Sequence, residues 1–171
     1  LRLMLLTFGR PVKLLKAEWS EFDLDRAEWR IPAERMKMRE PHVVPLSKQA
    51  VELLRELHTH TGGRGMLFPN YRNPKECMTA TTLNRALERM GFNGKDSIGF
   101  SAHGFRATAS TILNEMGYRP DVIERQLAHA ERNKVRASYN QAQYMEDRRN
   151  MMQEWADMVE NMMKPKEGAE Q

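Results

Sequence analysis

The segment SAHGFRATAS, residues 101–110, contains two side chains that can bind a phosphate. His103 and Arg106 are three positions apart, so they share one face of the helix expected here. That face lies off the apolar stripe that includes Phe105, so both side chains are expected to point toward solvent or a ligand. Near a helix N-terminus, free N–H groups and the macrodipole attract an anion. The pair is a candidate phosphate site, with an ordinary exposed polar face as the alternative.

A histidine and two tyrosines follow in QLAHAERNKVRASYNQAQY, residues 126–144. His129 ends the helix expected from Pro120, where a histidine is more often a favourable cap than a catalyst. A phenol has a pKa of about 10, so a nucleophilic tyrosine needs a proton acceptor and a polarised phosphate. Tyr144 falls on the apolar stripe of the last expected helix, whereas Tyr139 lies about 140° from it around a continuous helix. Packing in this stripe explains Tyr144 but does not account for Tyr139.

Two basic residues in the first half of the chain complete the candidate set. Arg10, in LTFGRP, lies at a helix break where Pro11 fixes the backbone. Lys37, in ERMKMRE, lies in a connection between two predicted strands, beside Arg35 and Arg39. Each has an ordinary interpretation, as a surface arginine or as part of a solvated basic loop. The order Arg, Lys, His-x-x-Arg, His, Tyr carries more information than any one of its members.

The elements expected to position these residues are mostly helical, with one strand-rich insert. Residues 28–31 and 42–46 are short β-biased runs that contain or adjoin proline, and they predict a small antiparallel sheet. Apolar residues at i, i+3, i+4 and i+7 predict helices along much of the rest. The predicted helices cover residues 1–8, 11–19, a segment after the N-cap Ser47, a segment from a cap at Thr79 or Thr81 to a stop at Gly91, and residues 101–116, 120–127 and 141–163.

Apolar stripes predict which faces of two later helices are buried. The stripe of the helix over residues 101–116 consists of Phe105, Ala109, Ile112 and Met116. The stripe of the last helix consists of Tyr144, Met151, Trp155, Met158 and Met162.

Composition and charge describe a globular chain that suits an anionic partner. The chain has 171 residues, 40% of them hydrophobic and 29% charged, and this length can bury a core without disulfides. Residues 146–171 contain four Lys and Arg and seven Asp and Glu, a balance of −3. Because the net charge of the chain is +4, the first 145 residues carry +7. A basic body suits nucleic acid, with a solvated surface as the alternative.

The single cysteine, Cys77, excludes an internal disulfide and fits a cytoplasmic location. The apolar start, interrupted by Lys13, is too short to span a membrane.

These motifs together resemble the catalytic domain of the tyrosine recombinases, the phage-integrase family, and most closely the prophage and genomic-island integrases. The likeness is carried by TFGRP, WSEFDLDRAEWRIPAERMKMREPHVVPLS, HGFRATAST, QLAHAERNKVRASYNQ and MMQEWAD, and it covers about residues 1–159. It implies an α+β fold, mainly α-helical with a small antiparallel sheet. We expect a catalytic domain over residues 1–163, a disordered tail over residues 164–171, and N-terminal DNA-binding domains that this chain does not contain.

The resemblance implies DNA strand cleavage and rejoining through a 3′-phosphotyrosyl intermediate at attachment sites in double-stranded DNA. It implies no metal and no nucleotide cofactor. It also implies a homotetramer on DNA, with a monomer as an alternative for the chain alone. His58 and His60 form an H-x-H without accompanying ligands, so no metal site is predicted. The implied roles are Tyr139 as nucleophile, Arg10 and Arg106 as phosphate clamps, His129 as a hydrogen-bond donor to the phosphate, His103 as acceptor of the tyrosine proton, and Lys37 as general acid.

One departure from the family keeps other functions open. The family usually reads R-x-G-E after the first arginine, whereas this chain reads RPVK, with Val12 at the small position and Lys13 at the acid. A contact with a phosphate is an alternative role for Lys13. The competing interpretations are a DNA-binding domain that has lost catalysis, a topoisomerase IB-like enzyme, and an all-α regulator in which residues 101–128 form a helix-turn-helix.

Overall fold

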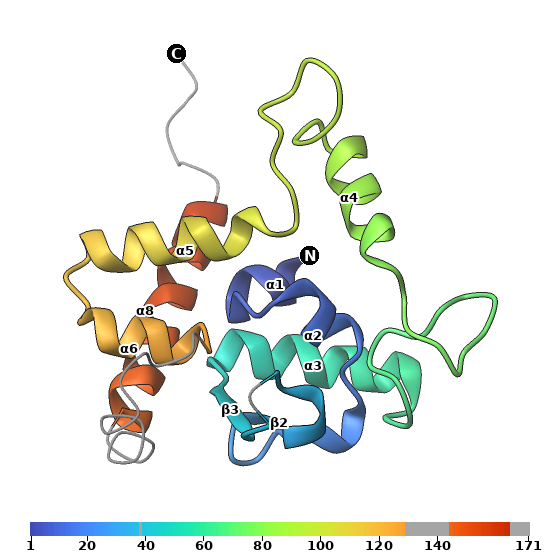
Figure 1. Ribbon diagram of the computed structural model, residues 1–171, viewed down its shortest axis with the longest axis horizontal. Coiled ribbons are helices and arrows are strands. Elements are labelled where there is room, and N and C mark those ends of the chain that lie inside the picture. Colours follow the sequence, from blue (N-terminus) through green and yellow to red (C-terminus); the bar gives the residue numbers. More distant parts are fainter. Residues whose placement is uncertain (38, 129–143, 165–171) are drawn as a thin grey trace.

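The computed structural model describes residues 1–37, 39–128 and 144–164, and the chain folds into helices and one small antiparallel sheet (Figure 1). The expectation of a mainly helical α+β fold is therefore confirmed. The helices are α1 (Arg2–Thr7), α2 (Pro11–Leu15), α3 (Lys48–Thr61), α4 (Ala80–Arg89), α5 (Gly104–Glu115), α6 (Pro120–Gln126) and α8 (Met145–Met163), with 3-10 turns η1 (Trp19–Glu21) and η2 (Ala33–Arg35). None of the helices in these described ranges is both long and apolar enough to cross a membrane.

The sheet contains the two predicted strands and one that was not predicted. Strands β2 (Glu28–Ile31) and β3 (His42–Pro45) are antiparallel, with Trp29 opposite Val44 and Ile31 opposite His42. The additional strand β1 (Phe22–Asp23) pairs with the other edge of β2. It has only two residues, too few to produce an alternating hydrophobic pattern in the sequence.

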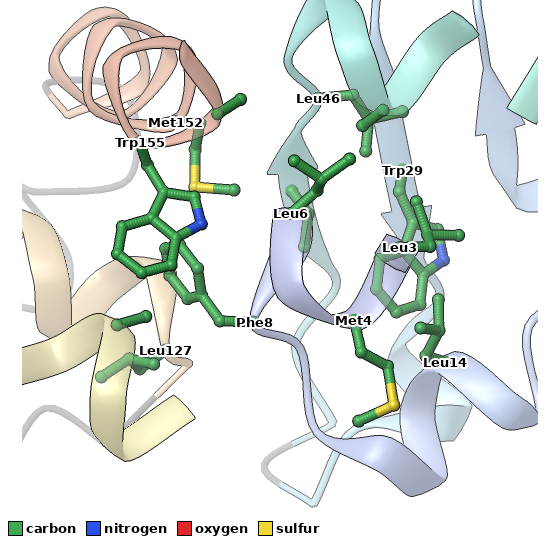
Figure 2. Close-up of a cluster of buried hydrophobic side chains, with 14 of the residues drawn as sticks. Leu3, Met4, Leu6, Phe8, Leu14, Trp29, Leu46, Leu127, Met152 and Trp155 are labelled. Atoms are coloured by element: carbon green, nitrogen blue, oxygen red, sulfur yellow. The ribbon is translucent and has the colours of Figure 1, made fainter. Parts of the chain in front are cut away.

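Helix α1 lies at the centre of the core, in contact with α3, α5 and α8 (Figure 1). It is apolar on nearly all sides, which is typical of a buried helix. Figure 2 shows Trp155 and Met152 of α8 beside Phe8, while Met4 and Leu14 lie near Trp29. The Trp155 indole N–H donates a hydrogen bond to the Leu5 carbonyl at 2.8 Å, and its ring meets Phe8 edge-on at 5.9 Å between centroids. The helix from which the chain leads to Arg10 is thus held rigidly.

Most helix boundaries follow the predicted caps, but two do not. The Ser47 hydroxyl accepts a hydrogen bond from the Ala50 N–H at 3.3 Å, and Gly91 has the positive φ of a helix stop, so both predictions are confirmed. The prediction that the second helix extends to Trp19 is wrong, because α2 ends at Leu15. Backbone groups of residues 17 and 19 instead bond to residues 65 and 67, a tertiary pairing that local propensity does not reveal.

Helix α5 begins later than predicted, and its most deeply buried residues coincide only in part with the predicted stripe. It starts at Gly104 with His103 as its N-cap, because residues 101–104 form a turn instead of a helix start. The predicted stripe is only partly correct: Ala109 is buried, whereas Phe105 and Ile112 are half-buried. The buried residues of α5 are Arg106, Ala109 and Leu113.

Helix α8 docks on the body of its own chain, in contact with α1, α3, α6 and β3. Tyr144, Met151 and Trp155 are buried as predicted, but Met162 is 70% exposed and its assignment to the buried stripe is wrong. Tyr144 is the N-cap of this helix, and the Arg119 guanidinium lies 5.2 Å from the centre of its ring. Packing therefore accounts for Tyr144. Residues 141–143 of the predicted helix lie outside the described ranges, as does the tail beyond residue 164.

Candidate active site

A cavity of about 240 Å³ lies where the α1–α2 turn, the sheet, α5 and the end of α6 meet. Four cationic side chains line it: Arg10, Lys13, Lys37 and Arg106. Among the described residues that line it, none is an aspartate or a glutamate. The lining therefore favours an anionic ligand.

Arg106 is the most firmly held of these cations. Its side chain reaches inward from α5 and donates hydrogen bonds to the carbonyls of Phe8 at 2.9 Å and Leu127 at 2.8 Å. Burial, followed by the charge of Arg10, lowers the pKa of Arg106 to about 10, and Glu124 acts in the opposite direction. The guanidinium is still protonated at neutral pH. The alternative of an ordinary exposed polar face is wrong for Arg106, because its buried guanidinium donates to two carbonyls inside the fold.

Arg10 approaches the same cavity from an exposed position. It is the N-cap of α2, and its carbonyl accepts hydrogen bonds from the N–H groups of Lys13 and Leu14. The preceding Gly9 packs against the sheet, where an added Cβ would lie 3.2 Å from the Trp29 ring. Backbone contacts thus fix the main-chain position of Arg10, while its exposed side chain is free to contact a ligand.

Lys37 is exposed in the connection between β2 and β3, as predicted. The base of that connection is anchored by Arg35, whose guanidinium donates to the Glu21 carboxylate and to the Lys13 carbonyl. Glu21 is buried and also accepts a hydrogen bond from the Trp29 indole N–H at 2.9 Å. The interpretation of this segment as a uniformly solvated basic loop is therefore wrong for Arg35. Lys37 extends from an anchored base.

His103 is exposed and is not among the residues that line the cavity. It is one turn from Arg106, and its carbonyl accepts the Arg106 N–H at 3.2 Å, but the two side chains lie in different environments. The structure brings Arg10, Lys37 and Arg106 together. His129 and Tyr139 lie outside the described residues.

His42 is a buried member of the cavity lining that sequence reasoning missed. It is the first residue of β3, is 5% exposed, and its Nε2 has no hydrogen-bond partner in the described part of the chain. Burial, followed by the charges of Arg148 and Arg125, lowers its pKa to about 3, so it is neutral at neutral pH. Alternation along the strand places His42 on the same face as Val44, and this signal could have identified it.

Arg148 is a second buried residue near the site that the sequence did not single out. It lies in the first turns of α8, is 2% exposed, and donates to the Gln126 side-chain oxygen at 2.9 and 2.7 Å and to the Val43 carbonyl at 2.6 Å. Burial first, then Arg125 and Arg149, lowers its pKa to about 9. Arg148 thereby ties the start of α8 to the end of α6 and to β3.

The cavity and its cations agree with the comparison to known proteins. Residues 1–146 match the model described as the phage integrase family. The chain belongs to the phage integrase family. It is 47% identical over 155 residues to prophage integrase IntA of Escherichia coli (strain K12), covering 91% of this chain and 37% of that protein. The chain spans less than half the length of the curated relatives it matches.

Solved structures of phage-integrase and recombinase proteins share the fold. The integrase from mycobacterium phage Brujita superposes with a TM-score of 0.63 at 20% identity, covering 88% of this chain and 48% of that one. The XerH site-specific recombinase, solved bound to its difH substrate in a pre-cleavage complex, superposes with a TM-score of 0.59 at 18% identity. That match covers 82% of this chain and 43% of XerH.

The residue after Val12 departs from the pattern that the resemblance led us to expect. The R-x-G-E pattern expected for a phage integrase would place a carboxylate at position 13, whereas Lys13 lines the cavity here. The site consequently gains a cation where the pattern has an anion.

Proposed function

We propose that this chain is the catalytic domain of a site-specific DNA recombinase, which cleaves and rejoins DNA through a 3′-phosphotyrosyl intermediate. The observation that carries the proposal is the meeting of Arg10, Lys37 and Arg106 at one cavity, although they are far apart in the sequence. Family membership supplies the chemistry that such a cluster serves. Double-stranded DNA is the proposed substrate, and four copies are proposed to assemble on it.

Arg10 and Arg106 are proposed to clamp the scissile phosphate. Guanidinium groups can hold two non-bridging oxygens and stabilise the charge of the pentacoordinate transition state. The two carbonyl contacts of Arg106 support this role because they orient the guanidinium before DNA arrives. Loss of one preorganised donor is expected to raise the barrier by about 3 kcal/mol, by analogy with oxyanion holes.

Tyr139 is the proposed nucleophile. Its phenolic oxygen forms a bond to phosphorus while the bond from phosphorus to the 5′-oxygen breaks, with His103 accepting the phenol proton. Lys37 donates a proton to the leaving 5′-oxygen, a role that suits an exposed ammonium on an anchored connection. His129 is proposed to donate a hydrogen bond to the phosphate. The ester bond conserves the energy needed for religation.

A nicked suicide substrate tests the proposed reaction. The protein at its natural length is mixed with DNA that carries its attachment site and a nick that lets the cleaved fragment escape. A covalent protein–DNA adduct that survives denaturation is expected. It should disappear in Tyr139→Phe and persist in Tyr144→Phe, a matched control that keeps the buried ring of Tyr144. An adduct that forms without the Tyr139 hydroxyl would refute the assignment.

The second candidate function is DNA binding without cleavage, and Lys13 is the observation that favours it. A lysine occupies the position where the family pattern has an acid, and it lies at the candidate catalytic cavity. This alternative predicts specific binding of the attachment site without any adduct from the unsubstituted protein. Adduct formation by that protein excludes it.

A further inference from the structure

Lys13 occupies a fixed position at the edge of the cavity. It belongs to α2, is half-buried, and lines the cavity together with Arg10 and Arg106. Its N–H donates to the Arg10 carbonyl at 2.8 Å, and its own carbonyl accepts a hydrogen bond from Arg35. Both peptide groups are therefore held, and the side chain starts from a defined point.

Among the described residues, no carboxylate is paired directly with the Lys13 ammonium. Burial lowers the pKa of Lys13, the charges of Arg35 and Arg10 lower it further, and Glu21 acts in the opposite direction. Glu21 is itself bonded to Arg35 and Trp29. A negatively charged ligand in the cavity would therefore favour the protonated lysine.

His42 gives an independent indication that the cavity holds a polar ligand. Its side chain is 5% exposed and lines the same cavity, yet Nε2 has no partner in the part of the chain that the structure describes. Buried polar atoms are nearly always hydrogen-bonded in native proteins, because an unpaired one is destabilising. The cavity is thus lined by cations and by a buried histidine whose Nε2 has no hydrogen-bond partner among the described residues.

We propose that Lys13 binds a DNA phosphate in this cavity, as a further phosphate ligand beside Arg10 and Arg106. The inference deepens the proposed function and rests on it. At the position where the family pattern has an acid, this chain uses a cation to strengthen its hold on the phosphodiester. Lys13 acts in binding, separately from the proton transfers proposed for Lys37 and His103.

The test measures binding to two DNA duplexes in a Tyr139→Phe background, so that cleavage does not interfere. One duplex carries the normal attachment site, and the other carries a neutral methylphosphonate at the scissile phosphate. Lys13→Met is compared with Lys16→Met, which removes the same charge from the C-cap of the same helix and does not line the cavity. Lys13→Met is expected to weaken binding of the normal duplex about tenfold, as for a hydrogen bond to a charged group.

The methylphosphonate decides whether the contact is direct. On the neutral duplex the effect of Lys13→Met should disappear, whereas any effect of Lys16→Met should remain. Lys13→Arg should retain binding, and Lys13→Glu should lose more than Lys13→Met. An equal loss on both duplexes, no loss, or tighter binding by Lys13→Glu would each overturn the proposal. Because binding does not require the Tyr139 hydroxyl, this outcome is independent of the adduct assay.

Discussion

Two buried arginines of this protein, Arg106 of α5 and Arg148 of α8, are held by similar hydrogen bonds but lie in different parts of the fold. Each donates hydrogen bonds to neutral oxygens: Arg106 to two backbone carbonyls, and Arg148 to Gln126 and the Val43 carbonyl. Arg106 lines the cavity, whereas Arg148 is not among the described residues that do so. One carbonyl-bound guanidinium faces the proposed ligand, and the other joins three elements of the fold.

The difference teaches that burial of a charge does not by itself identify a catalytic residue. Burial lowers the pKa of both arginines, to about 10 for Arg106 and about 9 for Arg148. The larger shift belongs to Arg148, which is the one that does not line the cavity. Position relative to the cavity, not the size of the shift, therefore assigns the proposed function. Substitutions that separate reaction rate from stability can test this division.

The largest expected effect is on the reaction rate of Arg106→Lys. A lysine keeps the charge but lacks the planar fork that meets the Phe8 and Leu127 carbonyls together. The rate of adduct formation on the nicked substrate should fall on the order of a hundredfold, as for a lost preorganised donor. The unfolding temperature provides the control. A normal rate in this variant would remove Arg106 from the proposed clamp.

Arg148→Met should reverse that pattern by lowering stability more than rate. Methionine fills part of the volume but leaves the Gln126 side-chain oxygen and the Val43 carbonyl without their buried donor. The free energy of unfolding in urea should fall by about 3 kcal/mol, the sum for two buried acceptors. Adduct formation, measured well below the unfolding transition, should change less than in Arg106→Lys. If the rate falls as far as in that variant, the distinction between the two arginines is wrong.

The sequence predicts the elements of the fold better than the direction of their side chains. Periodicity and caps located β2, β3, α3 and α6, because each has a clear stripe, a proline or a capping residue. The same signals misplaced the buried face of α5, since a helical stripe treats arginine as polar and outward. Arg106 turns inward because its acceptors, the carbonyls of Phe8 and Leu127, are brought to it only by tertiary folding.

The candidate site was predictable only through the order of its residues. No local pattern brings Arg10, Lys37 and Arg106 to one cavity, and the resemblance to a family supplied that grouping. His42 could have been found from strand alternation, but nothing local marks the partners of Arg148, which come from distant elements. The long-range hydrogen-bond partners of buried polar side chains are the feature of the site that a single sequence does not predict.

A pH-dependent loss of stability should report on His42, which the charges of both arginines affect. Its pKa is lowered from 6.5 to about 3, mainly by burial, then by Arg148, with Arg106 the smallest contributor. Below about pH 6.5 the unfolded chain binds a proton that the folded chain does not, so stability falls as the pH falls. Between pH 7 and 5 this histidine should remove about 2 kcal/mol from the free energy of unfolding.

His42→Leu isolates that contribution, because the other titrating groups remain. Urea unfolding of both proteins at pH 7 and pH 5 should show a smaller loss in the variant, by about 2 kcal/mol. Arg148→Met should also reduce the loss, since it removes the strongest charge acting against protonation. Identical pH profiles for His42→Leu and the unsubstituted protein would show that His42 titrates normally in the folded state.

The smallest expected effect comes from Ser47→Ala, which serves as the reference for both arginines. The Ser47 hydroxyl caps α3 by accepting the Ala50 N–H, and Ser47 does not line the cavity. Its loss should lower the free energy of unfolding by about 1 kcal/mol, as is usual for an N-cap. Adduct formation below the unfolding transition should be unchanged, because α3 supports the core through α1 and α8 and contributes no proposed phosphate ligand. A reduced rate in Ser47→Ala would mean that the adduct assay responds to stability alone. The rates of Arg106→Lys and Arg148→Met would then have to be compared at equal fractions of folded protein.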